Sequence, residues 1–159
     1  MIRRIGIDVG GVIIDSLTND NTDTSFCRGD FLRTTAVIDS FTAIRQIVSR
    51  YGSENVFIVS KCGAVIENKT RLWLNHTGFY AQTGFCSENL YFCLNRAGKA
   101  PIAQRLGLTD FIDDKEQVLG YMQGIVDRRY LFGPQHHPLK NPSDLIIVAN
   151  WAAVLSELP

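Results

Sequence analysis

Acidic residues directly follow apolar stretches at two places in this sequence. Asp8 follows the apolar residues 5–7. Asp113 and Asp114 follow the apolar residues 108–112. Because a charged carboxylate is costly to bury, each acid is expected where its strand emerges toward solvent. Clustered carboxylates repel one another and need a cation, and with water and a substrate phosphate they suit Mg²⁺. The sequence therefore predicts a magnesium site at the ends of two strands.

Other groups suited to phosphate chemistry occupy similar positions. Gly10 and Gly11 allow a sharp turn after the first acid and leave main-chain N–H groups uncovered. Ser60 ends the next apolar run, and Lys99 stands at an expected helix start. A carboxylate, a divalent cation, a lysine and converging donors are the parts that phosphoryl transfer requires. Each residue alone is also typical of a cap or of the solvated surface, so the prediction depends on their joint placement.

Alternating hydrophobic patterns indicate the elements that position these residues. Strands are predicted at 3–9, 56–59, 90–94, 108–112, 125–132 and 145–148, and helices at 35–51, 64–76, 98–106, 115–121 and 150–158. Thr35 is the expected N-cap of the first helix. Residues 12–14 form a short apolar segment that fits one arm of a hairpin. Residues 16–30, 79–89 and 133–143 are expected to be irregular.

This alternation predicts the α/β class, as a three-layer Rossmann-like sandwich with a mainly parallel central sheet. The length of 159 residues suits one domain, so a single α/β domain over 1–159 is expected. In such a sheet the loops gather at the carboxyl ends of the strands. Asp8, Ser60 and the acidic pair fall at those ends, and Lys99 lies shortly after the third strand. We therefore expect these side chains to meet.

Composition narrows the functional classes. Sixteen basic and sixteen acidic residues give a formal net charge of zero, so no basic field favours nucleic acid, although an open site would accommodate one. No apolar run approaches the roughly 20 residues that span a bilayer. The cysteines contain no Cys-x-x-Cys pair, which indicates reduced cysteines in a cytoplasmic protein rather than a disulfide framework or a zinc site. They are Cys27, Cys62, Cys86 and Cys93.

The order of these motifs resembles the haloacid dehalogenase-like superfamily, whose members are mostly phosphohydrolases. Residues 8–12 match its Asp-x-Asp-x-(Thr/Val) motif except at the second Asp. Ser60 matches a strand-ending Ser or Thr, and Lys99 matches a lysine at a helix start. Asp113 and Asp114 match an acidic pair that ends a strand. The resemblance spans nearly the whole chain, and its first and fourth motifs are the specific ones.

The resemblance implies a role for each matched residue. Asp8 would be the nucleophile that becomes an aspartyl-phosphate, and Lys99 would balance charge around it. Ser60 would bond a phosphoryl oxygen. The expected substrate-binding residues are Gly10, Gly11, Ser60, Lys61 and Lys99. The expected ligands of the cofactor, Mg²⁺, are Asp8, the backbone carbonyl of Gly10, Asp113 and Asp114.

Gly10 is the main departure from the family pattern. It stands in place of the second Asp, which is the family's general acid–base, a role worth about 10²–10⁴-fold in rate. Three interpretations follow: a phosphatase that favours good leaving groups or takes its proton from elsewhere, an inactive phosphate- or partner-binding relative, or a dehalogenase. A dehalogenase would have no need for the magnesium-type pair Asp113 and Asp114, so it is the least favoured of the three. The expected function is a weakened or leaving-group-restricted magnesium-dependent phosphohydrolase, and the inactive module is the alternative.

The gaps between the motifs leave no room for the cap domain that most members of that superfamily carry. Capless members act on large substrates or close their sites with a neighbouring subunit, so a large phosphorylated substrate and a homo-oligomer both remain open. Loops 16–33 and 133–143 are expected to flank the site. The loop residues that would then touch substrate are Arg28, Arg33, His136 and His137.

Residues 5–11 also resemble the first phosphate loop of sugar kinases and other actin-like ATPases, which contains Asp-x-Gly-Gly-Thr. Here Val12 replaces the threonine. Those enzymes have two domains and generally longer chains, and nothing downstream repeats the pattern. The phosphohydrolase interpretation is therefore preferred.

Overall fold

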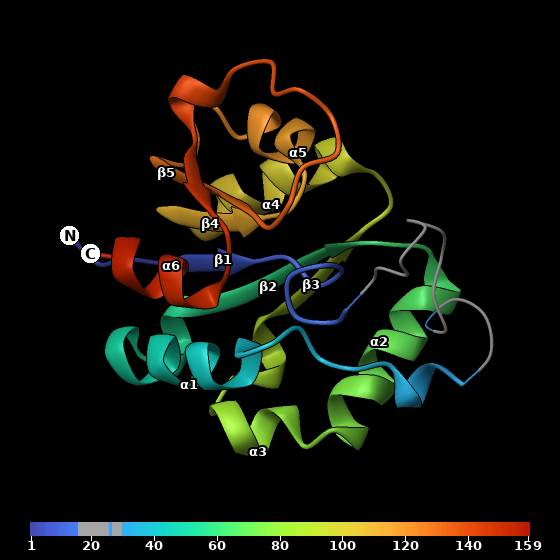
Figure 1. The fold of residues 1–159 in the computed structure, drawn as a ribbon. Helices are drawn as coiled ribbons and strands as arrows, with labels where there is room; N and C mark the ends of the chain where they lie inside the picture. The colour runs from blue at the N-terminus through green and yellow to red at the C-terminus, as the bar shows by residue number, and fades with distance from the viewer. Residues whose placement is uncertain (16–25, 27–29) are drawn as a thin grey trace.

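A six-stranded sheet forms the centre of the molecule (Figure 1). The computed structural model describes residues 1–15, 26 and 30–159. The strands are β1 (Ile5–Ile7), β2 (Val56–Lys61), β3 (Leu90–Cys93), β4 (Asp110–Asp113), β5 (Arg128–Phe132) and β6 (Ile146–Val148). Their order is β3-β2-β1-β4-β5-β6, and every neighbouring pair is parallel. The predicted α/β class with a mainly parallel sheet is confirmed.

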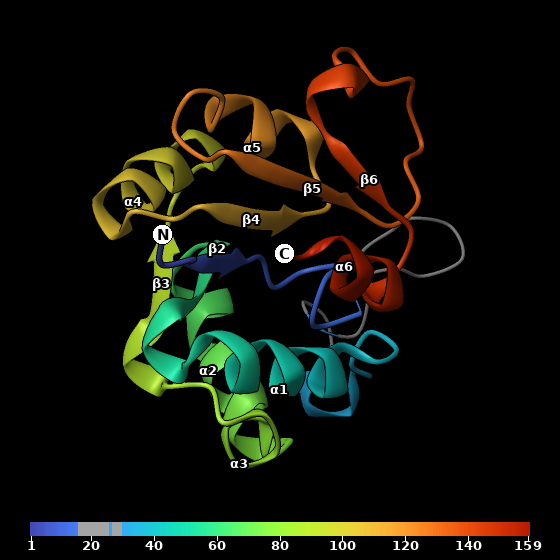
Figure 2. The same ribbon diagram turned by 90° about the vertical axis from the view of Figure 1, so that its left-hand side faces the viewer.

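Helices cover both faces of this sheet. They are α1 (Ser40–Tyr51), α2 (Ala64–His76), α3 (Phe79–Thr83), α4 (Lys99–Leu106), α5 (Glu116–Tyr121) and α6 (Trp151–Glu157). Helices α1, α2, α3 and α6 pack on one face, and α4 and α5 pack on the other (Figures 1 and 2). Each face buries its own apolar cluster, so the molecule has the three predicted layers.

Strands β1 and β4 lie side by side in the middle of the sheet. Gly6 pairs with Phe111, and a Cβ on Gly6 would lie 2.4 Å from the Phe111 ring, so the ring packs against bare backbone. The pairing continues past the end of β1, where the Asp8 N–H donates to the Ile112 carbonyl at 2.9 Å. This register brings Asp8 level with Asp113, the last residue of β4.

The first helix begins later than the sequence suggests. Helix α1 starts at Ser40, and the preceding residue is Asp39 with φ 66°, so Thr35 is not its N-cap. Residues 35–37 are instead held by the segment after β1: the Asp15 N–H donates to the Thr35 carbonyl, and the Val37 N–H donates to the Ile13 carbonyl. The predicted start was wrong because these long-range backbone bonds replace the first helical turns.

Other element boundaries also differ from the predictions. Residues 12–14 form a turn with isolated bridges rather than a hairpin arm, since the N–H groups of all three donate to the Val9 carbonyl. The stretch 79–89 is not irregular, because it contains α3 and a short 3-10 turn. Strand β5 begins at Arg128 rather than at residue 125. None of the helices in the described ranges is long and apolar enough to cross a bilayer. Three of the four cysteines lie among the described residues, and these are free.

Candidate active site

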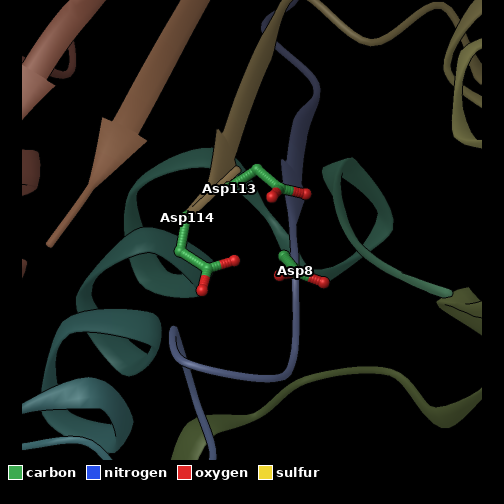
Figure 3. Close-up of side chains that lie close together, drawn as sticks. All are labelled: Asp8, Asp113 and Asp114. Carbon is green, nitrogen blue, oxygen red and sulfur yellow. The ribbon is translucent and has the colours of Figure 1, made fainter. Parts of the chain in front are cut away.

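Three aspartates meet at the carboxyl edge of β1 and β4 (Figure 3). One carboxylate oxygen from each of Asp8, Asp113 and Asp114 lies within 4.8 Å of the others. Asp8 and Asp113 are buried, and Asp114 is half-buried. These residues line a hollow of about 230 Å³. The predicted meeting of side chains from distant parts of the sequence is therefore observed.

Lys99 ties two of the three carboxylates together. Its Nζ donates to Asp8 Oδ1 and to Asp113 Oδ2, both at 2.7 Å, and its side chain is only 3% exposed. Burial opposes the ammonium charge, but the attraction of Asp8 and Asp113 outweighs it and raises the pKa of Lys99. Lys99 therefore stays cationic beside the predicted nucleophile.

The carboxyl groups of Asp113 and Asp114 both have raised pKa values. Burial, followed by the nearby charge of Asp8, raises the pKa of Asp113 to about 8, although Lys99 opposes the shift. The same two causes raise the pKa of Asp114 to about 6 against the attraction of Lys115. Lys99 and Lys115 face these acids, and the raised pKa values of Asp113 and Asp114 indicate that the two lysines do not fully offset the repulsion. A divalent cation bound among the carboxylates would offset the rest.

The donor set fits Mg²⁺. Three converging carboxylates offer hard oxygen ligands, which Mg²⁺ prefers. Both oxygens of Asp113 already accept hydrogen bonds, one from Lys99 and one from the Lys115 N–H at 2.9 Å. Lys99 engages Oδ1 of Asp8 and leaves Oδ2 for other partners. Asp8 and Asp114 therefore accept fewer hydrogen bonds from the protein than Asp113, and their oxygens are more available to a metal ion.

The turn after Asp8 is fixed by backbone bonds. Gly11 has φ 77°, a conformation that favours glycine, and its N–H donates to Ile14. Gly10 is exposed and lines the hollow, and a Cβ there would meet no atom within 4 Å. The space that an acid at this position would occupy is open. Gly11 is not among the described residues that line the hollow, so its binding to substrate stays a prediction.

Two further predicted residues line the hollow, and two cationic residues there were missed. Ser60, which is buried, and Lys61, which is exposed, come from the end of β2. Arg96 and Lys115 were not predicted, although both line the hollow. Their sequence positions carried a usable signal, since Arg96 stands three residues before Lys99 and Lys115 directly follows the acidic pair.

The turn between β3 and α4 places Arg96 and Lys99. Asn95 caps this turn by accepting a hydrogen bond from the Gly98 N–H at 2.8 Å. Gly98 has little room, because a Cβ there would lie 3.2 Å from the Cβ of Cys93. Helix α4 then begins at Lys99 as predicted. A short capped turn therefore fixes both cations relative to the sheet.

Of the flanking loops, the structure describes residues 133–143 completely and only residues 26 and 30–33 of the other. Gln135 donates to the Asp114 carbonyl at 3.1 Å, so loop 133–143 does reach the site. The side chains of Arg33, His136 and His137 are exposed and are not among the described residues that line the hollow. Arg33 pairs with Asp30 at 3.3 Å. Arg28 lies outside the described residues.

Comparison with known proteins supports the fold. The sequence matches no protein-family model and no curated protein. Its structure is similar to the crystal structure of D,D-heptose 1.7-bisphosphate phosphatase from B. bronchiseptica, which is complexed with magnesium and phosphate. The TM-score is 0.66 at 13% sequence identity, over 98% of this chain and 97% of that one. The six-stranded parallel sheet with helices on both faces is therefore an arrangement that this chain shares with that phosphatase.

Proposed function

We propose that this protein is a magnesium-dependent phosphohydrolase that acts through Asp8. One observation carries the proposal: Asp8, Asp113 and Asp114 converge within 4.8 Å, and the buried Lys99 bridges the first two. The similar phosphatase structure contains magnesium and phosphate, which supports the same ligands here. The reaction class is hydrolysis of a phosphate monoester.

In the first step an oxygen of Asp8 attacks the phosphorus atom. A bond forms between Asp8 and phosphorus, the bond from phosphorus to the leaving oxygen breaks, and an aspartyl-phosphate results. In the second step water attacks phosphorus, which releases inorganic phosphate and restores Asp8. Lys99 donates to Oδ1 of Asp8 and so fixes the orientation of the carboxylate that attacks. Asp113 keeps Lys99 in place through its own 2.7 Å contact.

Gly10 sets the limit on the leaving group. No acid stands two residues after Asp8 to protonate the departing oxygen. A leaving group that is stable as an anion, such as a phenolate, does not need that proton, whereas an alkoxide does. We therefore propose that aryl or acyl phosphates react faster than alkyl phosphates, unless the substrate itself supplies the proton.

Ser60 and Lys61 are the proposed partners of the transferred phosphoryl group. Both line the hollow at the end of β2, and Gly10 lines it as well. Asp8, the Gly10 carbonyl, Asp113 and Asp114 would hold the magnesium ion. When bound, Mg²⁺ would neutralise the carboxylates and polarise the phosphoryl oxygens.

An assay with an aryl phosphate and magnesium tests the proposal. Asp8→Asn should lower kcat by at least about 10³-fold, since nucleophile and metal ligand are lost together. Asp127→Asn is the matched control because Asp127 is exposed and does not line the hollow. Equal activity of wild type and Asp8→Asn would reject Asp8 as the nucleophile.

The absence of an acid at Gly10 also supports a second candidate, a phosphate- or partner-binding module without turnover. This candidate predicts that magnesium and inorganic phosphate bind while no tested phosphate ester is hydrolysed. Hydrolysis by wild type that Asp8→Asn abolishes would eliminate it. Calorimetric titration of both proteins with magnesium and phosphate measures the binding separately from turnover.

The surroundings of the site suggest how substrate enters. Between Ser60 and Lys99 the chain forms α2, α3 and β3, where α2 and α3 pack on the sheet and β3 is one of its strands. We therefore propose a capless domain that admits a large phosphorylated substrate or is closed by a second copy. The cytoplasmic location stays a prediction from the sequence.

A further inference from the structure

We propose that the substrate carries a second anionic group, a phosphate or a carboxylate, which Arg96 binds at the rim of the hollow. This inference rests on the proposed function, because it concerns the part of the phosphate ester that leaves. It starts from four cations that surround three acids in one small site. The four are Lys61, Arg96, Lys99 and Lys115.

Formal charges show that one cation is surplus. The four cationic side chains and one Mg²⁺ carry six positive charges against three carboxylates. The dianion of a phosphate monoester offsets two of the remaining three. One positive charge is then left without a partner. An unmatched positive charge in a confined hollow attracts another anion.

The contacts indicate which cation is the unmatched one. Lys99 is bound by two carboxylates at 2.7 Å, and Lys115 Nζ lies 3.5 Å from Asp114 Oδ2. Lys61 lies directly beside Ser60, where the transferred phosphoryl group is proposed to bind. Among the described residues, no carboxylate lies within ion-pair distance of Arg96. Arg96 is therefore the cation whose charge the site itself does not use.

Arg96 is also held in position for binding. Its NH1 donates to Gln117 Oε1 at 2.8 Å, which fixes the guanidinium against α5 without neutralising it. The capped turn at Asn95 fixes its backbone. The side chain is exposed. A guanidinium offers five N–H donors in one plane, so the donors that Gln117 does not use can bind a carboxylate or a phosphate with two parallel hydrogen bonds.

Binding of three phosphonates, which have no hydrolysable ester bond, tests this inference. Propylphosphonate has an uncharged tail, 3-phosphonopropionate adds a carboxylate, and propane-1,3-bisphosphonate adds a second phosphonate. With magnesium held constant, calorimetry should give a Kd for wild type about tenfold lower for either doubly anionic compound than for propylphosphonate. A tenfold ratio corresponds to about 1.4 kcal/mol. The two tails distinguish a carboxylate from a phosphate as the preferred second group.

Variants assign the effect to Arg96. Arg96→Ala should reduce the tenfold ratio to about one, and Arg96→Lys should retain part of it. Gln117→Glu should also reduce it, since a carboxylate then neutralises Arg96 in place. Arg105→Ala is the matched control, because Arg105 is exposed on α4 and does not line the hollow. Circular dichroism checks that each variant is folded.

The outcomes separate this inference from the proposed function. A ratio near one in wild type, or a ratio that Arg96→Ala leaves unchanged, would overturn the inference even if aryl phosphates are hydrolysed. The expected ratios without any hydrolysis would support anion binding at Arg96 and reject the proposed reaction. Failure of all three phosphonates to bind would overturn the inference, and the aryl phosphate assay would then decide the proposed function by itself.

Discussion

Two buried aspartates stand at opposite ends of β4, and their surroundings differ. Asp110, at the start of the strand, accepts hydrogen bonds from Arg3 at 3.0 Å, from Thr109 at 2.6 Å and from Tyr130 at 2.9 Å. Asp113, at its end, shares the single cation Lys99 with Asp8 and faces Asp114 as well. Both side chains are fully buried.

We propose that this difference separates a carboxylate that stabilises the fold from one that helps to bind a metal ion. Asp110 is surrounded by cationic and hydroxyl donors that satisfy its charge. The Nε of Arg128 also lies 3.8 Å from Asp110 Oδ1. Asp113 belongs to a group in which acids outnumber the buried cation, and its pKa is raised to about 8 by burial and by Asp8. A satisfied acid stabilises the fold, whereas an acid that lacks sufficient positive charge favours binding of a cation. Four changes should break or sharpen this contrast.

The largest effect is expected at Lys99. Lys99→Met should lower the free energy of unfolding by about 4 kcal/mol at pH 8, because it leaves buried carboxylates without their cation. The loss should be smaller at pH 5, where the acidic pair can take up protons, and magnesium should restore part of it. Urea unfolding at both pH values measures this, with Lys140→Met as the exposed control. A loss that is equal at both pH values would contradict the account.

Removing the charge at the other end of β4 should affect stability alone. Asp110→Asn should lower the free energy of unfolding by about 3 kcal/mol, since Arg3 loses its buried partner. The kcat for an aryl phosphate should not change in the folded fraction. Thermal unfolding and activity measured on the same preparation test both statements, and Asp127→Asn provides the exposed control. A variant with normal stability and lost activity would reverse the assignment of the two ends.

Adding a fourth carboxylate beside Asp8, Asp113 and Asp114 should improve catalysis. Gly10→Asp should raise kcat/KM for an alkyl phosphate by about 10²-fold, because it supplies the missing general acid. The gain should be smaller for an aryl phosphate with a good leaving group. The added side chain has open space, since a Cβ at Gly10 meets nothing within 4 Å. Gly120→Asp, also in open space, is the control. Unchanged rates for both substrate classes would mean that Gly10 does not occupy the acid–base position.

The smallest effect is a pH dependence of stability. Burial and Asp8 raise the pKa of Asp114 to about 6, so the folded protein binds more protons than the unfolded chain between about pH 4 and pH 6. The free energy of unfolding without metal should therefore fall as pH rises through this window. The contribution of Asp114 is on the order of 2 kcal/mol. Asp114→Asn should make the fall between pH 4 and pH 6 shallower, while the fall that Asp113 contributes up to about pH 8 remains. Magnesium should stabilise wild type more at pH 8 than at pH 5. A curve that Asp114→Asn leaves unchanged would place the titration elsewhere.

Most of the site was predictable because its residues stand at the ends of locally recognisable elements. Apolar runs that end in Asp8, Ser60 or the acidic pair reveal strand ends directly in the sequence. Parallel strands then bring those ends to one edge. The two cations that were missed, Arg96 and Lys115, are surface residue types whose importance depends on what lies opposite them.

The sequence could not distinguish Asp110 from Asp113. Both are acids in or beside the same predicted strand. Asp110 is satisfied by Arg3, which is 107 residues away in the chain, and by Tyr130 on the neighbouring strand. The start of α1 shows the same limit, because residues 35–37 pair with the segment after β1 instead of starting the helix.

The sequence by itself determined the order of strands and helices and the chemical groups at the strand ends, because hydrophobic period and residue type are local properties. Only the tertiary structure decided which charges are paired. It set β1 beside β4, gave Lys99 to Asp8 and Asp113, and left Arg96 with a neutral partner. The physical reason is that the energy of a charge depends on its burial and on neighbours within a few ångströms, and those neighbours come from distant parts of the chain.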